Sequence, residues 1–274
     1  MIAGKYRIES VLGSGGAGRV YKARNEMLAR DVAVKLLRDE HTDDDALVER
    51  FLREARATHM VRHPHVVDVL DVGLHGAVPY IVEELLVGED LSDYLARKGG
   101  RLAVRAALAR MLPVVDGVAH AHARGVVHRD LKPENVFLAR TPDGVVPKVL
   151  DFGISKIDVD DRRRRTTAVG TLMGTPEFMA PEQIQRFSEA DARADVWSLG
   201  VMLYELLAGR TPFRGQDPGA LFVEICTRDH LPLDAAVHSV PPELVAVVHR
   251  CLRRDPAERY ADAGALAAAL AIVT

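Results

Sequence analysis

The sequence pattern changes from strand-like to helical near Gly88, and this change limits the folds open to the chain. Before it, "KYRIESVLG", "GRVYKARN" and "RDVAVKLL" alternate side chains or carry valines at period two, as short strands joined by turns do. The segment "DALVERFLREARATHMV" has helical spacing, and "VVDVLDVGLHGAVPYIVEELL" returns to two strand-like runs. The residues before Gly88 therefore predict an antiparallel sheet with one helix.

After Gly88 the sequence consists mainly of long helical segments. They are "RAALARMLPVVDGVAHAHARG", "ADVWSLGVMLYELLAG", "PGALFVEICTRD", "PELVAVVHRCLRRD" and "ADAGALAAALAIV". Pro113 lies inside the first of them, where a residue without a backbone N–H is expected to kink or interrupt the helix. The chain is thus predicted to be α+β, with a small sheet lobe and a larger, mainly helical lobe.

Composition removes several classes of function. The 274 residues, of which 48% are hydrophobic, can bury one large core or two modest ones, and the net charge of −3 gives no reason to expect nucleic acid or an anionic membrane as partner. The N-terminus lacks the apolar core of a signal peptide, and no run approaches the roughly 20 apolar residues of a membrane span. Cys226 and Cys251 stand alone, without disulfide or metal-site spacing. We expect a cytoplasmic protein.

The segment "GSGGAGRV" contains the pattern G-x-G-x-x-G-x-V, with Gly13, Gly15, Gly18 and Val20. Glycines let the backbone approach a polyphosphate closely. A dinucleotide-binding turn would need a helix after the glycines, whereas "RVYKARN" is strand-like. A glycine-rich hairpin turn has the same pattern, but a strand–loop–strand flap over phosphates fits the context best.

Lys35 is embedded in the apolar run "DVAVKLL", in a chain that has only seven lysines among its 36 basic residues. A lysine on a strand edge often serves only to prevent aggregation. The alternative is an inward-pointing lysine that grips phosphate oxygens and is held by a carboxylate, for which Glu54 on the following helix is suitable. We favour the second interpretation.

Two further segments supply the groups that phosphoryl transfer needs. In "VLDFGISK" an apolar strand precedes Asp151, and this carboxylate with the amide oxygen of Asn135 could hold magnesium, which prefers oxygen ligands. In "HRDLKPENVFL" Asp130 can then accept the proton of an attacking hydroxyl, while Lys132 steadies the charge on the moving phosphoryl group. The reaction that uses all these groups is phosphoryl transfer from a nucleoside triphosphate.

With these motifs in this order, essentially the whole chain resembles a eukaryotic-type Ser/Thr protein kinase of the kind found in bacteria. The resemblance implies one catalytic domain over residues 1–274, with an N-lobe of about residues 1–83, a hinge of about 84–88 and a C-lobe of about 89–274. It implies ATP and Mg²⁺, with Mn²⁺ as an alternative metal, and metal ligands Asn135 and Asp151. The implied catalytic residues are Asp130, Lys132, Lys35, Glu54 and Thr175. The implied ATP contacts are Leu12, Gly13, Ser14, Gly15, Gly16, Ala17, Gly18, Val20, Ala33, Lys35, Glu84, Leu86 and Phe137.

The C-terminal half carries two segments that distinguish a protein kinase from a small-molecule phosphotransferase. "GTPEFMAPE" resembles the segment that receives a peptide, with Thr175 bridging Asp130 and Lys132. "DVWSLG" resembles the buried helix that anchors the catalytic loop through Asp195. Glu182 is expected to pair with Arg259 in "DPAERY", although two unrelated surface charges would have the same sequence.

Lys132, two residues after Asp130, is typical of the Ser/Thr form, so the expected partners are proteins with Ser or Thr acceptors, including the kinase itself, and a kinase dimer is an open alternative. Glu134 resembles a position that favours basic substrate residues in some relatives, but a solvated glutamate is equally consistent. Arg129, beside the catalytic aspartate, would gain from a phosphate on the activation loop. The phosphosite candidates are Thr171, Thr167 and Thr166, the last two directly after the run Arg162–Arg165, which is expected to be a solvated loop.

One residue departs from the family pattern. Glu83 in "YIVEELL" occupies the gatekeeper position, where a bulky apolar residue or threonine is usual. A buried carboxylate is expensive without a partner, so Glu83 either pairs with a cation such as Lys35 or a polar ligand group, or faces solvent through a shift of one residue. A pseudokinase is the rival class, but Lys35, Glu54, Asp130 and the two metal ligands are all present, which favours an enzyme. The sequence identifies neither the activating signal nor the physiological substrate, nor whether the native chain extends beyond Thr274.

Overall fold

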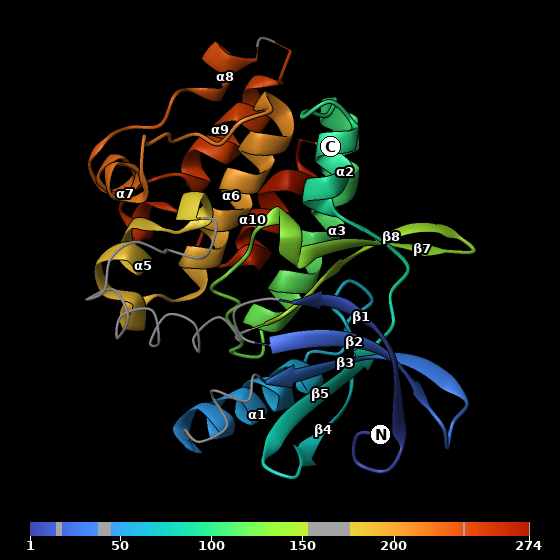
Figure 1. Ribbon diagram of the computed structural model, residues 1–274. Helices are drawn as coiled ribbons and strands as arrows, with labels where there is room; N and C mark the ends of the chain where they lie inside the picture. Colours follow the sequence, from blue (N-terminus) through green and yellow to red (C-terminus); the bar gives the residue numbers. More distant parts are fainter. Residues whose placement is uncertain (15–17, 38–44, 153–175, 238, 274) are drawn as a thin grey trace. The chain divides into compact units, whose positions relative to one another are not determined.

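The computed structural model describes residues 1–14, 18–37, 45–152, 176–237 and 239–273 (Figure 1). The chain forms two compact units. The first holds Met1–Val87 and the segment that begins at Asp151, and the second holds Gly88–Leu150 and the chain from Gly174 onward. The predicted lobe boundaries stay a prediction.

The first unit is built on a five-stranded antiparallel sheet, in the order β1-β2-β3-β5-β4. Its strands are β1 (Tyr6–Ser14), β2 (Gly18–Asn25), β3 (Arg30–Leu37), β4 (Val69–His75) and β5 (Val78–Glu84). A single described helix, α1 (Asp45–Met60), lies between β3 and β4 in the chain and packs against β4 and β5. This unit has the elements that the sequence pattern predicts.

Alternation along β3 divides its side chains between two cores, because successive residues of a strand point to opposite faces. Leu37 belongs to the core that contains α1, with Phe51, Ala55, Val69 and Ile81. Val32 and Val34 belong to the opposite core, with Ile2, Tyr6, Ala23, Tyr80 and Val82. Since Lys35 is two residues from Leu37, it shares the face that α1 covers.

The second unit is mainly helical, as predicted, and α6 (Ala192–Ala208) is its central element. Nearly every residue from Ala194 to Leu207 is buried, as expected for a helix that is apolar on all sides. Gly200 lets α9 approach α6, because a Cβ there would lie 2.5 Å from the Cβ of Cys251. The other helices are α2 (Leu91–Arg97), α3 (Val104–His122), α5 (Pro181–Arg186), α7 (Pro218–Thr227), α8 (Leu233–Ala236), α9 (Pro242–Cys251) and α10 (Ala263–Ala271), with short 3₁₀ turns η2 (Pro133–Asn135), η3 (Pro176–Phe178), η4 (Phe187–Glu189) and η5 (Pro256–Glu258).

Pro113 does not interrupt its helix, so the interruption expected as one of its two possible effects is wrong. The helix α3 runs through it from Val104 to His122. The carbonyl of Ala109 would normally accept the missing N–H bond, and Ala109 is exposed, so water can satisfy that carbonyl. The proline is therefore tolerated at a wet position of the helix.

The second unit also contains a small sheet, of which the sequence predicted only the strand before Asp151. Its strands β6 (Gly88–Asp90), β7 (Val136–Thr141) and β8 (Gly144–Val149) pair antiparallel in that order. Gly88 is needed there, since a Cβ would lie 2.1 Å from the carbonyl oxygen of Leu138. The sheet holds β7, which directly follows the candidate catalytic loop, and β8, which ends two residues before Asp151. None of the helices in the described part of the chain has the length and apolar character that a bilayer crossing requires.

Candidate active site

Lys35 points into the first unit and is paired with a carboxylate. Its side chain is 9% exposed, and Nζ lies 2.8 Å from Oδ1 of Asp151. Asp151 has a φ of +55°, a left-handed conformation that is uncommon for a residue with a side chain. The neighbouring carbonyl of Phe152 accepts a hydrogen bond from Thr58 on α1. The side chain of Glu54, the predicted partner of Lys35, lies outside the described residues.

The register of the sheet groups several predicted ATP contacts with Lys35. Val20 of β2 lies opposite Lys35, and Glu83 of β5 lies opposite Ala33. Residues that face each other across an antiparallel pair share a face, so Val20, Ala33, Lys35 and Glu83 belong to one face of the sheet. The strands thus form a surface on which an apolar strip adjoins a lysine and a carboxylate.

Glu83 is half-buried on the face of the sheet that carries Lys35, which argues against the shifted, solvent-facing alternative. The pKa of its carboxyl is raised to about 7, mainly by burial and also by the charge of Asp151, against an opposing effect of Lys35. Lys35 and Asp151 are therefore close enough to act on Glu83. The side chain of the next residue, Glu84, instead accepts a hydrogen bond from the N–H of Asp68, and the N–H of Glu84 donates to the carbonyl of Asp68. Because the N–H of Glu84 is already used, a bound adenine would have to form its hydrogen bonds with other backbone groups of residues 84–86.

The glycine-rich segment is only partly described. Gly13 and Ser14 end β1 and Gly18 begins β2, whereas residues 15–17 lie outside the described residues. A Cβ at Gly18 would lie 2.1 Å from the carbonyl oxygen of Leu36, so strand packing alone requires glycine there. A Cβ at Gly13 would meet nothing within 4 Å. Leu12 is 52% exposed.

The second unit brings the three polar residues of the predicted catalytic loop together. Nζ of Lys132 lies 2.8 Å from Oδ2 of Asp130. The Nδ2 group of Asn135 donates to the carbonyl oxygen of Asp130 at 2.7 Å and to its Oδ2 at 3.1 Å. Because the amide nitrogen of Asn135 faces Asp130, its Oδ1 points away and is oriented for another ligand. Phe137 follows in β7, within the same unit.

The catalytic loop is held by a buried carboxylate of α6. Oδ2 of Asp195 accepts the N–H of His128 at 2.7 Å, and Oδ1 accepts the N–H of Arg129 at 2.7 Å. His122 of α3 lies 2.9 Å from the same carboxylate. Asp195 is fully buried, and charge-assisted bonds to backbone N–H groups are among the stronger ones in proteins. The structure therefore places Asp195 where the sequence predicted an anchor.

His128 is a positioning residue that the sequence interpretation did not include among the site residues. Its Nδ1 accepts the N–H of Asp130 at 3.2 Å, so Nε2 carries the proton and donates to the carbonyl of Leu150 at 2.7 Å. The fully buried ring thus joins the catalytic loop to the residue before Asp151. The first letter of "HRD" is the only sequence signal for this role.

Arg129 adopts a φ of +66°, and its carbonyl accepts a hydrogen bond from Gln183 at 2.9 Å. Gln183, the other residue that sequence did not single out, also accepts the N–H of Ala180. Among the described residues, the Nε of Arg129 is buried without a hydrogen-bond partner. This orphaned guanidinium nitrogen fits the expectation that Arg129 receives an anionic group.

Glu182 and Arg259 form a buried ion pair, as one of the two sequence interpretations predicted. Nη1 and Nη2 of Arg259 lie 2.7 Å and 2.8 Å from the two carboxylate oxygens of Glu182. The Arg259 side chain has no exposed surface, that of Glu182 is 18% exposed, and the guanidinium lies 4.9 Å from the Trp197 ring centre. The pair fastens α5, at the end of the "GTPEFMAPE" segment, to the C-terminal part of the unit.

Three carboxylates converge beside the catalytic loop. The pKa of Glu205 on α6 is raised to about 7, mainly by burial and also by the charges of Glu134 and Glu177. In the described part of the chain, one carboxylate oxygen each of Glu177 and Glu205 is buried without a hydrogen-bond partner. The remaining predicted site residues, Thr166, Thr167, Thr171 and Thr175, and the Arg162–Arg165 run lie outside the described residues.

A lysine–aspartate pair in a sheet unit, together with an aspartate–lysine–asparagine loop in a helical unit, is the set of parts that nucleotide-dependent phosphoryl transfer requires. The chain belongs to the protein kinase domain family, whose model matches residues 6–270. The resemblance inferred from the motifs is thereby confirmed.

Named relatives and solved structures agree with this assignment. Serine/threonine-protein kinase Pkn1 of Myxococcus xanthus is 40% identical over 271 residues, covering 98% of this chain and 38% of the relative. Serine/threonine-protein kinase PkaB of Streptomyces coelicolor is 41% identical, covering 94% of this chain and 60% of the relative. The PknI kinase domain of Mycobacterium tuberculosis superposes with a TM-score of 0.75 at 26% identity, covering 99% of this chain and 96% of that one. The chain spans less than half the length of the first of these relatives.

Proposed function

We propose that the protein transfers the γ-phosphoryl group of ATP to Ser and Thr hydroxyls of proteins, as a bacterial signalling kinase. The observation that carries the proposal is the loop in which Asp130 is contacted by both Lys132 and Asn135 and is anchored by Asp195. The named relatives are bacterial serine/threonine-protein kinases, which supports the acceptor class.

In this proposal Asp130 accepts the proton of the attacking hydroxyl through its carboxylate. Lys132, already within 2.8 Å of Asp130, stabilises the negative charge of the phosphoryl group during transfer. His128 and Asp195 do not touch substrate; they are positioning residues that fix the loop backbone. Thr175 is proposed to bridge Asp130 and Lys132 when a peptide is bound.

The first unit is proposed to bind the phosphates through Lys35, with Glu54 as its holding carboxylate. Val20 and Ala33 share the face of Lys35 and supply an apolar contact for adenine. Phe137, Glu84 and Leu86 are proposed to complete the nucleotide contacts, with the glycine-rich segment from Leu12 to Gly18 over the phosphates.

The donor set fits a divalent metal. Asn135 presents its Oδ1 away from Asp130, and Asp151 offers a carboxylate, so both candidates supply the oxygen ligands that Mg²⁺ prefers. We propose Mg²⁺, with Mn²⁺ as an alternative. When bound, the metal would neutralise charge on the triphosphate oxygens. Lys35 contacts Asp151 directly, so nucleotide and metal would draw these two side chains onto separate partners.

The three carboxylates Glu134, Glu177 and Glu205 support a preference for substrates with a basic residue near the acceptor hydroxyl. A Lys or Arg side chain would satisfy the orphaned oxygens of Glu177 and Glu205. A peptide series with and without arginine before the acceptor tests this: we expect arginine to raise kcat/KM, and Glu205→Gln to reduce the advantage. An equal advantage in the variant would contradict it.

Regulation is proposed to run through autophosphorylation at Thr171, Thr167 or Thr166, with the orphaned Nε of Arg129 as a receiver of the new phosphate. A kinase dimer and a cytoplasmic location complete the proposal. Phosphopeptide mapping of active protein tests the phosphosites, and finding all three threonines unmodified would contradict the regulatory part alone.

Transfer itself is tested by incubating the purified protein with ATP, Mg²⁺ and a generic protein substrate. We expect phosphate on Ser or Thr of the substrate, and none when Asp130 is replaced by Asn. A folded protein that binds ATP and transfers nothing would instead be a pseudokinase.

A further inference from the structure

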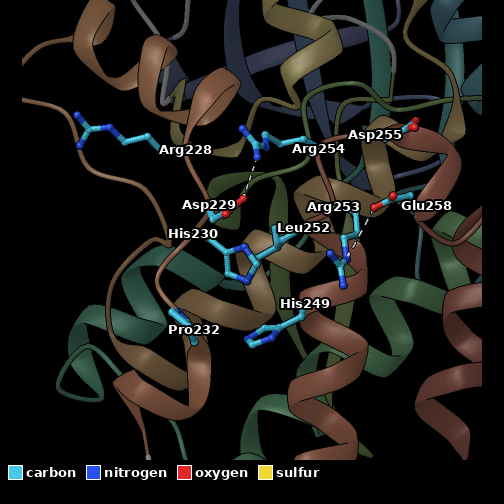
Figure 2. A pocket seen from close by; sticks show the side chains of 10 residues that line it. All are labelled: Arg228, Asp229, His230, Pro232, His249, Leu252, Arg253, Arg254, Asp255 and Glu258. Atoms are coloured by element: carbon cyan, nitrogen blue, oxygen red, sulfur yellow. Dashed lines mark hydrogen bonds and ion pairs between the residues drawn. The ribbon is translucent and has the colours of Figure 1, made fainter.

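A pocket of about 470 Å³ lies in the second unit, between the ends of α7 and α9 (Figure 2). We call it the α7–α9 pocket. Two histidines, His230 and His249, line it together with Leu252, three arginines and three carboxylates. None of these residues belongs to the proposed catalytic or ATP-binding set.

The two imidazoles form the polar wall of the pocket. Their ring centres lie 4.8 Å apart in an edge-to-face arrangement, at an interplanar angle of 73°. Nε2 of His249 accepts the N–H of Leu233 at 3.0 Å. Among the residues that the structure describes, Nε2 of His230 is buried without a hydrogen-bond partner. A buried polar atom of this kind is costly to leave unsatisfied.

The positive charge of Arg253 acts on both imidazoles, because it lowers the pKa of each. Its ion pair with Glu258 is weak: the two groups are 4.0 Å apart and both side chains are more than half exposed. Arg254, a second arginine of the rim, is better neutralised. Arg254 donates to the carbonyl of Thr227 at 2.6 Å and to Asp229 at 2.9 Å.

Both imidazoles are held in their neutral form. The pKa of His230 is lowered to about 4, mainly by burial and also by His249 and Arg253, while Asp229 acts in the opposite direction. Burial also lowers the pKa of His249, against an opposing effect from Asp234. An anion placed beside Arg253 would raise both values, so binding of an anion and uptake of a proton would be coupled.

We propose that the α7–α9 pocket binds one phosphate monoester group through Arg253, His230 and His249. A phosphate offers acceptor oxygens for a guanidinium fork and for an imidazole N–H at the same time. A metal ion fits less well, because no third His, Cys, Asp or Glu joins the two histidines in a metal-binding group within the described ranges. The carboxylates at the rim disfavour an extended polyanion. The phosphate could be carried by a phosphorylated protein side chain or by a small organic phosphate.

The test uses the full chain with Asp130→Asn, so that the protein does not phosphorylate itself, and follows the histidine side chains by NMR. The signals of His230 are assigned with His230→Gln. The probes are inorganic phosphate, a glycine-flanked phosphothreonine peptide, the same peptide without phosphate, and acetate. We expect the two phosphate probes to move the signals of His230 and His249 toward their protonated positions.

Arg253→Gln should weaken the apparent affinity roughly tenfold or more, as expected for loss of a charge-assisted contact, and Arg253→Lys should recover part of it. Arg186→Gln is the matched control, because Arg186 is also exposed and pairs with a glutamate at 3.4 Å. Tighter binding of the phosphopeptide than of inorganic phosphate would indicate a protein side chain as the source, and equal binding a small phosphate. Absent shifts, equal shifts with acetate, or an unchanged affinity in Arg253→Gln would overturn the proposal.

Discussion

Replacing Glu182 by alanine should destabilise the second unit far more than removing a surface charge does. The substitution leaves Arg259 buried, with a side chain that has no exposed surface and no carboxylate opposite it. The guanidinium itself is packed against the Trp197 ring, 4.9 Å from its centre. An uncompensated buried charge is one of the few mechanisms that give large single-mutant effects.

The size of the effect follows from the contacts that remain. Breaking a buried ion pair by removal of one partner costs about 3–5 kcal/mol. Arg259 keeps hydrogen bonds to the carbonyls of Arg193, Arg253 and Arg254, which still solvate part of its charge. We therefore expect the lower end, about 3 kcal/mol of unfolding free energy. For a chain of this size that corresponds to a drop in Tm of about 6–12 °C.

Urea unfolding followed by tryptophan fluorescence suits this test, because Trp197 is the only tryptophan and lies under the guanidinium. Arg259→Met combined with Glu182→Ala should cost less than the sum of the single changes, by about 1–3 kcal/mol. Glu189→Ala is the control, since its pair with Arg186 is exposed and should contribute under about 0.5 kcal/mol. An effect of Glu182→Ala no larger than the control, or strict additivity in the double variant, would refute the reasoning.

Three further outcomes follow from the site. Glu83→Gln should stabilise the protein by about 2–3 kcal/mol at pH 8 and by little at pH 5. The reason is that the folded carboxyl, with its pKa raised to about 7, is protonated below that pH and charged above it. Equal effects in urea unfolding at both pH values would contradict this. Asp195→Asn leaves one of two catalytic-loop N–H groups without its acceptor, and should lower kcat at least about tenfold with a smaller change in the KM for ATP; a change in KM alone would count against a positioning role. Gly18→Ala should destabilise the protein by about 1–3 kcal/mol, since the new Cβ meets the Leu36 carbonyl. Gly13→Ala should change stability by under about 1 kcal/mol, and similar thermal shifts for both variants would disprove the packing argument.

Local periodicity was sufficient for the main elements of the fold. The strand β3 carries valines at period two, and α6 is long and mostly apolar, so neither needs tertiary information to be predicted. The sheet β6–β8 is different: β6 has only three residues, too few to show a period, and it exists because Gly88 lets it approach β7. The continuous helix through Pro113 likewise depends on which carbonyl faces water.

The candidate site likewise contains residues whose roles the sequence could predict and residues whose roles it could not. Asp195, Glu182 and Arg259 could be predicted from motifs, because each lies in a distinctive run of residues. The environment of Glu83 could not, since its burial follows from the register that sets it opposite Ala33. His128 could not be assigned either, because its role depends on which nitrogen accepts and which donates. Lys35 showed its inward direction in the sequence, but its contact with Asp151 joins residues 116 positions apart.

The most direct test of the central claim is intact-mass and phosphopeptide spectrometry on the protein and on Asp130→Asn, each incubated with ATP, Mg²⁺ and a generic protein substrate. Asp130→Asn keeps a side chain of the same shape beside Lys132 and Asn135, so the loop should stay folded while the base is lost. The account predicts phosphate on Ser or Thr in the first sample and none in the second. Equal phosphorylation by both proteins, or none by either, would contradict the assignment of Asp130 as the base of a phosphoryl-transfer site.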